Sequence, residues 1–349
     1  MRFVLSSSFR LAGVLWLLAI SRSFSEEAPR LVIDPQGHSG LIKATIFTSG
    51  AEELVSLGND KTIRVWDGET GKLHRTLRTE VGDAEQGKHF CGALSPDGRW
   101  LAVAGWAGSG EKEAGAIRIL DFEKGTMAAV LFGHDDAVHS LSFSRDGRWL
   151  ASSSSDTNVR VWDVSVVGRN DEALVIRDSE VLSGHVNKVY VVAFAGNGID
   201  TLVSGSFDHS FRIWRRESPG KRFVERALFA NHEARIFAMD VSSDGTWAVT
   251  GDDEGKLLLW NVVAGSLVKT LDAKMELMVS TISIDPDGQR VLASSKSAKG
   301  GRTVIYSLPD GGLLQELAYH DNTVTASAWH PGGERFVTFS MHPYTLLLI

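Results

Sequence analysis

The sequence contains a single cysteine and no acceptor site for N-linked glycosylation. Cys91 is the only cysteine among 349 residues, and no Asn-x-Ser/Thr sequon occurs. The chain therefore forms no internal disulfide and must rely on a packed apolar core. Eukaryotic secreted proteins often carry several disulfides and a sequon, so these absences favour a bacterial origin if the chain is exported.

The sequence signatures of common hydrolases and redox proteins are also missing. The chain has no HExxH, GxSxG, GxxxxGK[ST] or CxxCH motif. This excludes the usual zinc peptidases, α/β-hydrolases, P-loop NTPases and covalent haem proteins. An active site scattered over several repeats is not excluded by this argument, because single motifs do not describe such sites.

Long apolar runs are absent except at the N-terminus. Leu11–Ile20 is apolar throughout, Arg2 and Arg10 lie before it, and the small residues of 23–25 follow. We interpret residues 1–25 as a signal peptide. Ten apolar residues are too few to cross a bilayer comfortably, so a retained membrane anchor is the weaker alternative.

Charge and hydropathy limit the partners of the mature chain. Without residues 1–25 it has 33 basic and 43 acidic residues, a formal charge of −10. This argues against general nucleic-acid binding, which needs a basic surface. No later segment is apolar enough to span a membrane and there is no lipobox cysteine. We therefore expect a soluble protein of the bacterial periplasm or the extracellular space.

A twelve-residue phrase recurs four times along the chain. It reads SLGNDKTIRVWD at 56–67, SSSSDTNVRVWD at 152–163, SGSFDHSFRIWR at 204–215 and TGDDEGKLLLWN at 250–261. Such self-similarity marks a repeat protein. Apolar residues within each repeat alternate or form short β-branched runs between Gly, Asp and Asn turn signals, which indicates short antiparallel strands. The sequence thus predicts one all-β domain.

The third repeat shows the expected strands most clearly. We expect strands at 138–144, 149–154 and 158–162, with a weaker fourth strand near 180–182. Tight hairpin turns are predicted at four Asp-Gly pairs, because this dipeptide suits positive φ angles. These pairs are Asp97-Gly98, Asp146-Gly147, Asp244-Gly245 and Asp287-Gly288.

The repeat closely resembles the WD40 repeat family, and in particular its exported bacterial members. The resemblance covers roughly residues 31–349. It is carried by the pairs Gly37-His38, Gly133-His134 and Gly184-His185, the weaker Asn231-His232 and Tyr319-His320, and the pairs Trp66-Asp67 and Trp162-Asp163. It implies a seven-bladed β-propeller of four-stranded antiparallel blades around a central channel. The expected blades span 37–79, 80–132, 133–183, 184–230, 231–272, 273–318, and 319–349 completed by 30–33.

The resemblance also predicts how the ring closes. Ile349 occupies the tryptophan place of the last unit, so the last blade lacks an outer strand. In this family the first strand after the N-terminus usually completes the last blade. We therefore expect Leu31-Val32-Ile33 to pair with the strand that ends at Ile349. A truncated chain is the alternative.

The recurring histidines are interpreted as structural rather than metal-binding. They lie in different blades and cannot converge on one ion. By the resemblance, each histidine bonds a turn carboxylate and a Ser or Thr that also meets the tryptophan. The expected sets are His38, Ser56, Asp60 and Trp66; His134, Ser152, Asp156 and Trp162; His185, Ser204, Asp208 and Trp214; and His232, Thr250, Glu254 and Trp260. A calcium site at Asp252-Asp253-Glu254 and a reactive Cys91 are the less favoured interpretations.

Three regions depart from the pattern. The second blade lacks the histidine and the tryptophan and has an inserted loop at 106–115. The sixth blade ends in Tyr306-Ser307 and has a basic loop at 296–302. We expect these two blades to be the least stable. The insertion at 166–180 is a surface excursion or, alternatively, a docking segment.

The residues that open each first strand point toward one rim of the channel in this family. Those three places after the recurring histidine are Leu41, Lys88, Ala137, Lys188, Arg235, Met278 and Thr323. Those five places after it are Lys43, Phe90, His139, Tyr190, Phe237, Ser280 and Thr325. Phe207 and Asn59 fall on the same rim. None of these residues is acidic, and aromatic residues next to cations are typical of binding hot spots.

The sequence therefore predicts a non-enzymatic, monomeric interaction scaffold without cofactor or metal. Its expected binding rim consists of Lys43, Lys88, Phe90, His139, Lys188, Tyr190, Phe207, Arg235 and Phe237, and its expected partner is an acidic polypeptide. The alternative is a propeller enzyme or a carbohydrate-binding module with its site at the channel mouth. A sensor or electron-transfer accessory protein is a third hypothesis, which rests on analogy alone.

Overall fold

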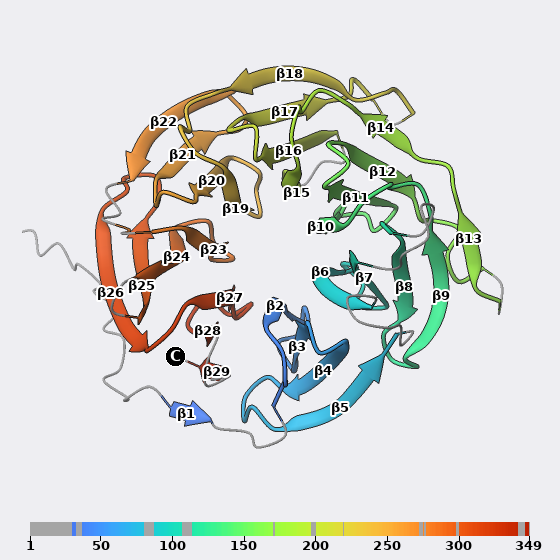
Figure 1. The fold of residues 1–349 in the computed structure, drawn as a ribbon, viewed down its shortest axis with the longest axis horizontal. Coiled ribbons are helices and arrows are strands. Elements are labelled where there is room, and N and C mark those ends of the chain that lie inside the picture. The colour runs from blue at the N-terminus through green and yellow to red at the C-terminus, as the bar shows by residue number, and fades with distance from the viewer. Residues whose placement is uncertain are drawn as a thin grey trace, which may run out of the picture.

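Antiparallel strands arranged radially around a central axis make up the molecule (Figure 1). The computed structural model describes residues 30–32, 37–79, 87–106, 114–169, 172–196, 200–218, 220–271, 275, 277–297, 300–340 and 346–348. Over these residues the all-β propeller predicted from the sequence is confirmed. The predicted signal peptide lies outside them, as do 107–113, 170–171 and 298–299 of the three irregular loops.

Each sheet follows the chain from an inner strand outward. The first contains β2 (Ile42–Phe47), β3 (Glu53–Gly58), β4 (Thr62–Asp67) and β5 (Leu73–Arg78). The next contains β6 (Lys88–Leu94), β7 (Trp100–Trp106), β8 (Ile117–Asp121) and β9 (Thr126–Leu131), and β13 (Leu174–Ile176) joins it later. Then come β10 (Val138–Phe143), β11 (Trp149–Ser154), β12 (Val159–Asp163) and β14 (Glu180–Leu182).

The second half of the ring repeats this order. It begins with β15 (Val189–Phe194), β16 (Thr201–Ser206), β17 (Phe211–Arg215) and β18 (Val224–Phe229). The following sheet contains β19 (Ile236–Val241), β20 (Trp247–Asp252), β21 (Leu257–Asn261) and β22 (Ser266–Leu271), and the next β23 (Val279–Ile284), β24 (Arg290–Ser297), β25 (Gly300–Ser307) and β26 (Leu313–His320). The last contains β27 (Val324–Trp329), β28 (Phe336–Ser340), β29 (Leu346–Leu348) and β1 (Arg30–Val32).

One sheet departs from the expectation of four strands per blade. Over the described residues, six sheets have four strands and the β6–β9 sheet has five. The extra strand, β13, comes from the insertion at 166–180 and pairs in parallel with β9. Sequence periodicity could not show this, because three residues of outer strand do not reveal which neighbouring sheet they join.

The last sheet takes its outer strand from the N-terminal end of the described chain. β1 pairs antiparallel with β29, with Arg30 opposite Leu348 and Val32 opposite Leu346. The pairing involves 30–32 rather than 31–33; Ile33 and Ile349 lie outside the described residues. Because the sheet joins segments from both ends of the sequence, it ties the ring together.

The apolar core lies between facing sheets. One cluster joins Val55 and Leu57 of β3 to Leu101 and Val103 of β7, and all four side chains are buried. Comparable clusters join the other neighbouring sheets. Each sheet thus buries both faces, which explains why the second and third strands are apolar on both sides.

Tight turns hold the strands in register where the sequence places Asp-Gly. The glycines of the four predicted turns have φ angles of 67–73°. This left-handed region is open to glycine without a steric penalty. The strands of the β10–β14 sheet also lie within one or two residues of their predicted ends.

The crossover segment, residues 164–179, fastens two sheets together. Ile176 O accepts a hydrogen bond from Phe132 N at 3.0 Å, and the Arg177 guanidinium lies 4.9 Å from the centre of the Phe132 ring. Leu174 and Ile176 pack against the cluster between the β6–β9 and β10–β12 sheets. The predicted surface excursion therefore docks on its own chain, on the sheet that lacks the histidine and tryptophan pair.

No helix among the described residues is long and apolar enough to cross a membrane.

We predict that the packing of β13 contributes measurably to stability. Ile176→Asp should lower the free energy of unfolding by about 1–2 kcal/mol, since a half-buried apolar side chain is replaced by a charge. Val175→Asp is the matched control, because this neighbouring side chain is 61% exposed. Urea denaturation compares the two variants, and equal losses would contradict a fastening role for β13.

Candidate functional site

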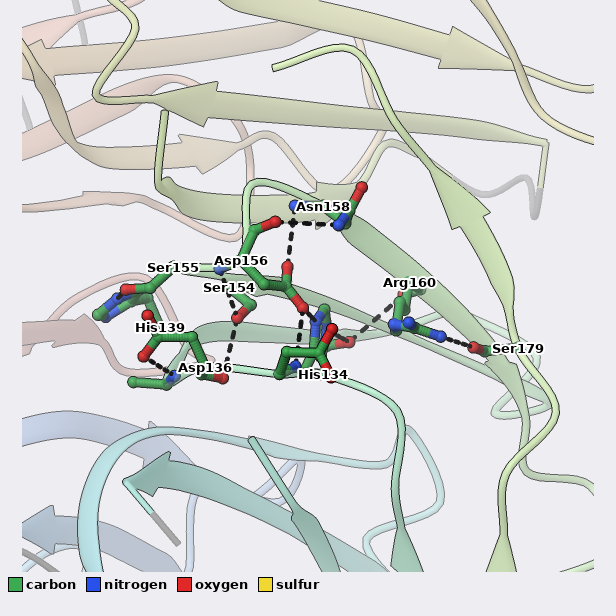
Figure 2. Close-up of polar contacts among 12 residues, drawn as sticks. His134, Asp136, His139, Ser154, Ser155, Asp156, Asn158, Arg160 and Ser179 are labelled. Atoms are coloured by element: carbon green, nitrogen blue, oxygen red, sulfur yellow. Dashed lines mark hydrogen bonds and ion pairs between the residues drawn. The ribbon is translucent and has the colours of Figure 1, made fainter. Parts of the chain in front are cut away.

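A buried polar network ties the first loop of a sheet to its inner strands in three sheets. In the sheet of β10, β11, β12 and β14, His134 Nδ1 lies 2.7 Å from Asp156 (Figure 2). His134 Nε2 lies 2.8 Å from Ser152 Oγ. Trp162 Nε1 donates to the same Ser152 hydroxyl at 2.9 Å. The structure brings together the same four predicted residues in two other sheets, namely His38, Ser56, Asp60 and Trp66, and His185, Ser204, Asp208 and Trp214.

The β19–β22 sheet corrects one predicted member of its network. His232 bonds Thr250, and Trp260 donates to that hydroxyl, but the carboxylate at His232 Nδ1 is Asp252, at 2.7 Å. Glu254, predicted for this role, is exposed and only its backbone N–H donates to Asp252. Asp252 lies on β20 within reach of the ring, so the shorter acid two residues earlier takes the contact.

These networks hold their carboxylates in the charged form. Burial alone would raise the pKa of Asp208, but the hydrogen bonds from His185 and Ser210 and the charge of His185 outweigh it, so the pKa is lowered. The pKa values of Asp60 and Asp156 are lowered in the same way, with burial opposed by His38 and His134. Hydrogen bonds to the charged form favour ionisation.

The residues of the two less favoured interpretations, a reactive cysteine and a calcium site, make structural contacts. Cys91 is buried, burial raises the pKa of its thiol, and Sγ faces the carbonyls of Ala104 and Val138. Asp252 bonds His232, and Asp253 bonds Arg235. Among the described residues, no three His, Cys, Asp or Glu side chains are grouped so that they could hold a metal ion.

A β-bulge lies at the start of every inner strand. In each pair of first and second strands the register shifts around one residue of the first strand. These seven residues are Lys43, Phe90, His139, Tyr190, Phe237, Ser280 and Thr325. They are the residues predicted five places after the histidine. Because a bulge leaves one residue unpaired and re-aims its side chain, it explains why they can face the channel rim.

The aromatic bulge residues stack on one another across neighbouring sheets. Phe90 and His139 have ring centres 6.0 Å apart with planes 4° apart, and His139 and Tyr190 are 4.7 Å and 22° apart. Tyr190 stacks on Phe207 at 5.1 Å, and Phe237 contacts both rings. The inner strands β6, β10, β15 and β19 follow one another around the axis (Figure 1). The structure therefore gathers the five predicted rings into one row, which we call the aromatic row.

Cations flank the aromatic row, but they differ in their pairing. Arg235 donates to Asp253 at 2.6 Å, and its guanidinium lies 5.3 Å from the centre of the Phe207 ring. Lys43 is half-buried, and burial lowers the pKa of its ammonium group. Lys188 is exposed. Sequence reasoning missed Asp253 as a rim residue, although it occupies the same place before the turn as Phe207 does.

His139 lies between Phe90 and Tyr190 in the row and is neutral at physiological pH. Its Nε2 lies 2.7 Å from Ser155 Oγ (Figure 2). Burial and, less strongly, the Lys188 and Lys43 charges lower the pKa of His139 to about 4, while Asp136 opposes the shift. The His139 ring thus serves as a stacking and hydrogen-bonding group rather than as a further cation.

Four segments of the chain match the WD40 repeat, described as WD domain, G-beta repeat: residues 30–67, 125–163, 177–215 and 224–261. Each match ends one residue after the tryptophan of a strand whose sheet carries the buried network. The chain thus contains four WD40 repeats within a β-propeller. The matches omit most of the β6–β9 sheet and all of the β23–β26 sheet, where the histidine and tryptophan are missing from the sequence.

Curated relatives of this WD40 propeller are eukaryotic proteins. Nuclear distribution protein nudF of Aspergillus niger is 29% identical over 240 residues, covering 64% of this chain and 52% of the relative. Target of rapamycin complex subunit wat1 of Schizosaccharomyces pombe is 28% identical over 214 residues, covering 60% and 59%. The WDR12 homolog of Ixodes scapularis, a ribosome biogenesis protein, is 26% identical over 241 residues, covering 64% and 54%.

Two consequences follow from these relatives. The chain spans somewhat more than half the length of the relatives it matches. The predicted resemblance to exported bacterial members finds no support among them, since all three are eukaryotic. WD40 propellers of this kind typically act as protein-interaction scaffolds.

We predict that removing the shared hydroxyl of a buried network is costly. Ser152→Ala leaves His134 Nε2 and Trp162 Nε1 without their partner, and each unsatisfied buried group costs about 1–3 kcal/mol. A loss of about 3 kcal/mol in unfolding free energy is expected. Ser266→Ala, on the exposed face of β22, is the control. A loss below about 0.5 kcal/mol for Ser152→Ala would refute the role of the hydroxyl.

The lowered aspartate pKa values predict acid sensitivity. A carboxyl whose folded pKa lies below its unfolded pKa adds stability above the unfolded pKa, and this stability is lost as pH falls through the folded pKa. Unfolding free energy should therefore decline below about pH 4. Asp208→Asn should lower stability at neutral pH and flatten this decline, as measured by urea denaturation across pH. A decline as steep as in wild type would contradict the assignment.

Proposed function

We propose that this WD40 propeller is a non-enzymatic scaffold whose aromatic row and flanking lysines bind an acidic polypeptide segment of a partner protein. The supporting observation is the row itself. Five rings from four neighbouring sheets lie in contact, four of them at bulges, and Lys43, Lys88 and Lys188 lie at the same ends of the inner strands. Aromatic anchors beside cations are the usual composition of binding hot spots.

The buried networks support this assignment by elimination. The histidines, aspartates and hydroxyls that would suggest catalysis hydrogen-bond one another inside the sheets. His139, the histidine of the row, has a lowered pKa and a serine partner but no carboxylate hydrogen bond among the described residues. A general base would need a pKa near the working pH. The row therefore fits recognition better than proton transfer.

Charge complementarity indicates the chemistry of the partner. The half-buried Lys43 ammonium has lost hydration, which an anionic ligand would replace. Lys188 is exposed on the other side of His139, and Lys88 opens β6 next to Phe90. A carboxylate approaching this surface would gain charge-assisted hydrogen bonds.

We also propose, from residues 1–25 alone, that the chain is exported and cleaved after Ser25. Expression of the full chain in a host with a secretion pathway, followed by N-terminal sequencing of the released protein, tests this. A new N-terminus at Glu26 is expected. A retained Met1 in a cytosolic product would overturn it.

The binding proposal predicts loss of partners on charge reversal. Lys43→Glu with Lys188→Glu should reduce recovery of co-purified partners at least about tenfold and remove its sensitivity to salt. Lys124→Glu with Lys221→Glu is the control, because these exposed lysines lie in loops between third and fourth strands, at the opposite strand ends. Unchanged partner recovery from the rim variant would sink the proposal.

A further inference from the structure

The bulge residues divide the rim into sectors of different chemistry. β2 contributes a lysine, β6, β10, β15 and β19 contribute rings, and β23 and β27 contribute hydroxyls. Ser280 donates to the carbonyl of Val324, and Thr325 donates to that of Phe339 at 3.4 Å. These two hydroxyls are thus turned back onto the backbone. The groups that remain for a ligand lie on the strands from β2 to β19.

The first of the remaining sectors is cationic. Lys43 is the bulge residue of β2, and Lys188 directly precedes β15. The inner strands follow one another around the axis in the order β2, β6, β10 and β15, so the two lysines come before and after His139 of β10 (Figure 1). Asp136 lies just before β10, and its Oδ1 accepts the backbone N–H of Ala137 at 2.6 Å. Two lysines against this one carboxylate give the sector a positive balance.

The second sector is apolar and electrically balanced. Tyr190, Phe207 and Phe237 contact one another with ring centres 4.6–5.1 Å apart, and all three are half-exposed. The cation of this sector, Arg235, is paired with Asp253 through two nitrogen atoms. The pair adds no net charge, so the three rings offer mainly apolar contact area.

We propose that the rim recognises a two-part extended peptide, with a carboxylate side chain between Lys43 and Lys188 and an apolar side chain on the cluster of Tyr190, Phe207 and Phe237. This inference rests on the proposed function and adds the order and spacing of the two parts. A uniformly acidic segment would leave the ring cluster without a partner, and a uniformly apolar one would leave the lysines without one.

The geometry sets the spacing of the two parts. The ring centres of His139 and Tyr190 are 4.7 Å apart and those of Tyr190 and Phe237 are 4.9 Å apart, so the His139 and Phe237 rings are at most about 10 Å apart. An extended chain rises about 3.3 Å per residue and alternate side chains share a face. The acid and the apolar residue are therefore two positions apart, as in Glu-x-Phe or Phe-x-Glu.

Fluorescence anisotropy with defined peptides tests the proposal. The probes are labelled Gly-Ser peptides of equal length that carry Glu-x-Phe, Phe-x-Glu, Gln-x-Phe, Glu-x-Ser, or Glu and Phe six positions apart. The full chain should bind one of the first two at least about tenfold more tightly than the other probes, which is about 1.4 kcal/mol. An oligonucleotide of the same length is included, and tighter binding of it would overturn the proposal.

Variants assign each part of the peptide to its sector. Lys188→Gln should weaken the two-part peptide about tenfold and leave Gln-x-Phe unchanged. Phe237→Ser should also weaken binding of the two-part peptide about tenfold, but it should leave the affinity for Glu-x-Ser unchanged. The charge-balanced double variant Arg235→Gln with Asp253→Asn should weaken binding less than Lys188→Gln does. Lys124→Gln is the control for a distant lysine, and thermal unfolding checks that each variant is folded.

The outcomes separate this inference from the proposed function. Equal affinity for Glu-x-Phe and Glu-x-Ser would overturn the two-part site but leave an acidic-peptide scaffold in place. Equal loss with Lys188→Gln and with the Arg235 and Asp253 double variant would also overturn it. If no acidic peptide binds more tightly than the Gln-x-Phe probe, the proposed function fails together with the inference.

Discussion

The packing of each sheet between two neighbours is the constraint on which the rest of the structure depends. The second and third strands are buried on both faces, with residues such as Val55, Leu101 and Val249 fully enclosed. Such a sheet is stable only when both neighbours are present, so the ring must close. β1 closes it by pairing with β29, and β13 reinforces the sheet whose sequence departs most from the repeat.

Because the ring closes, polar groups fall into two sets. Those inside the sheets stabilise the fold, and those at the bulges are available to bind a partner. Within a buried sheet each polar atom needs a hydrogen-bond partner. One hydroxyl, that of Ser152, hydrogen-bonds both His134 and Trp162. At the bulges the inner strands leave their ladder, and side chains there face the axis from several sheets at once. Residues far apart in sequence, such as Phe90 and Phe237, join a single row in this way.

Much of the scaffold followed from the sequence, and the exceptions have local causes. The recurring phrase located the strands, the Asp-Gly turns and the residues of three buried networks. Glu254 was a wrong assignment, because the repeat alignment ignored that Asp252 lies nearer to His232. The crossover segment was placed on the surface without a partner, because a three-residue strand carries no periodicity that names the sheet it joins.

The sequence by itself determined the repeat, the all-β class, the buried histidine sets and which residues open each inner strand, since these depend on local pattern and fixed spacing. Only the tertiary structure decided that those residues are bulged, that their rings stack across sheets, and that Arg235 is neutralised by Asp253 while Lys43 and Lys188 flank His139. These are contacts between sheets, and no periodicity within one sheet encodes the distance to its neighbour.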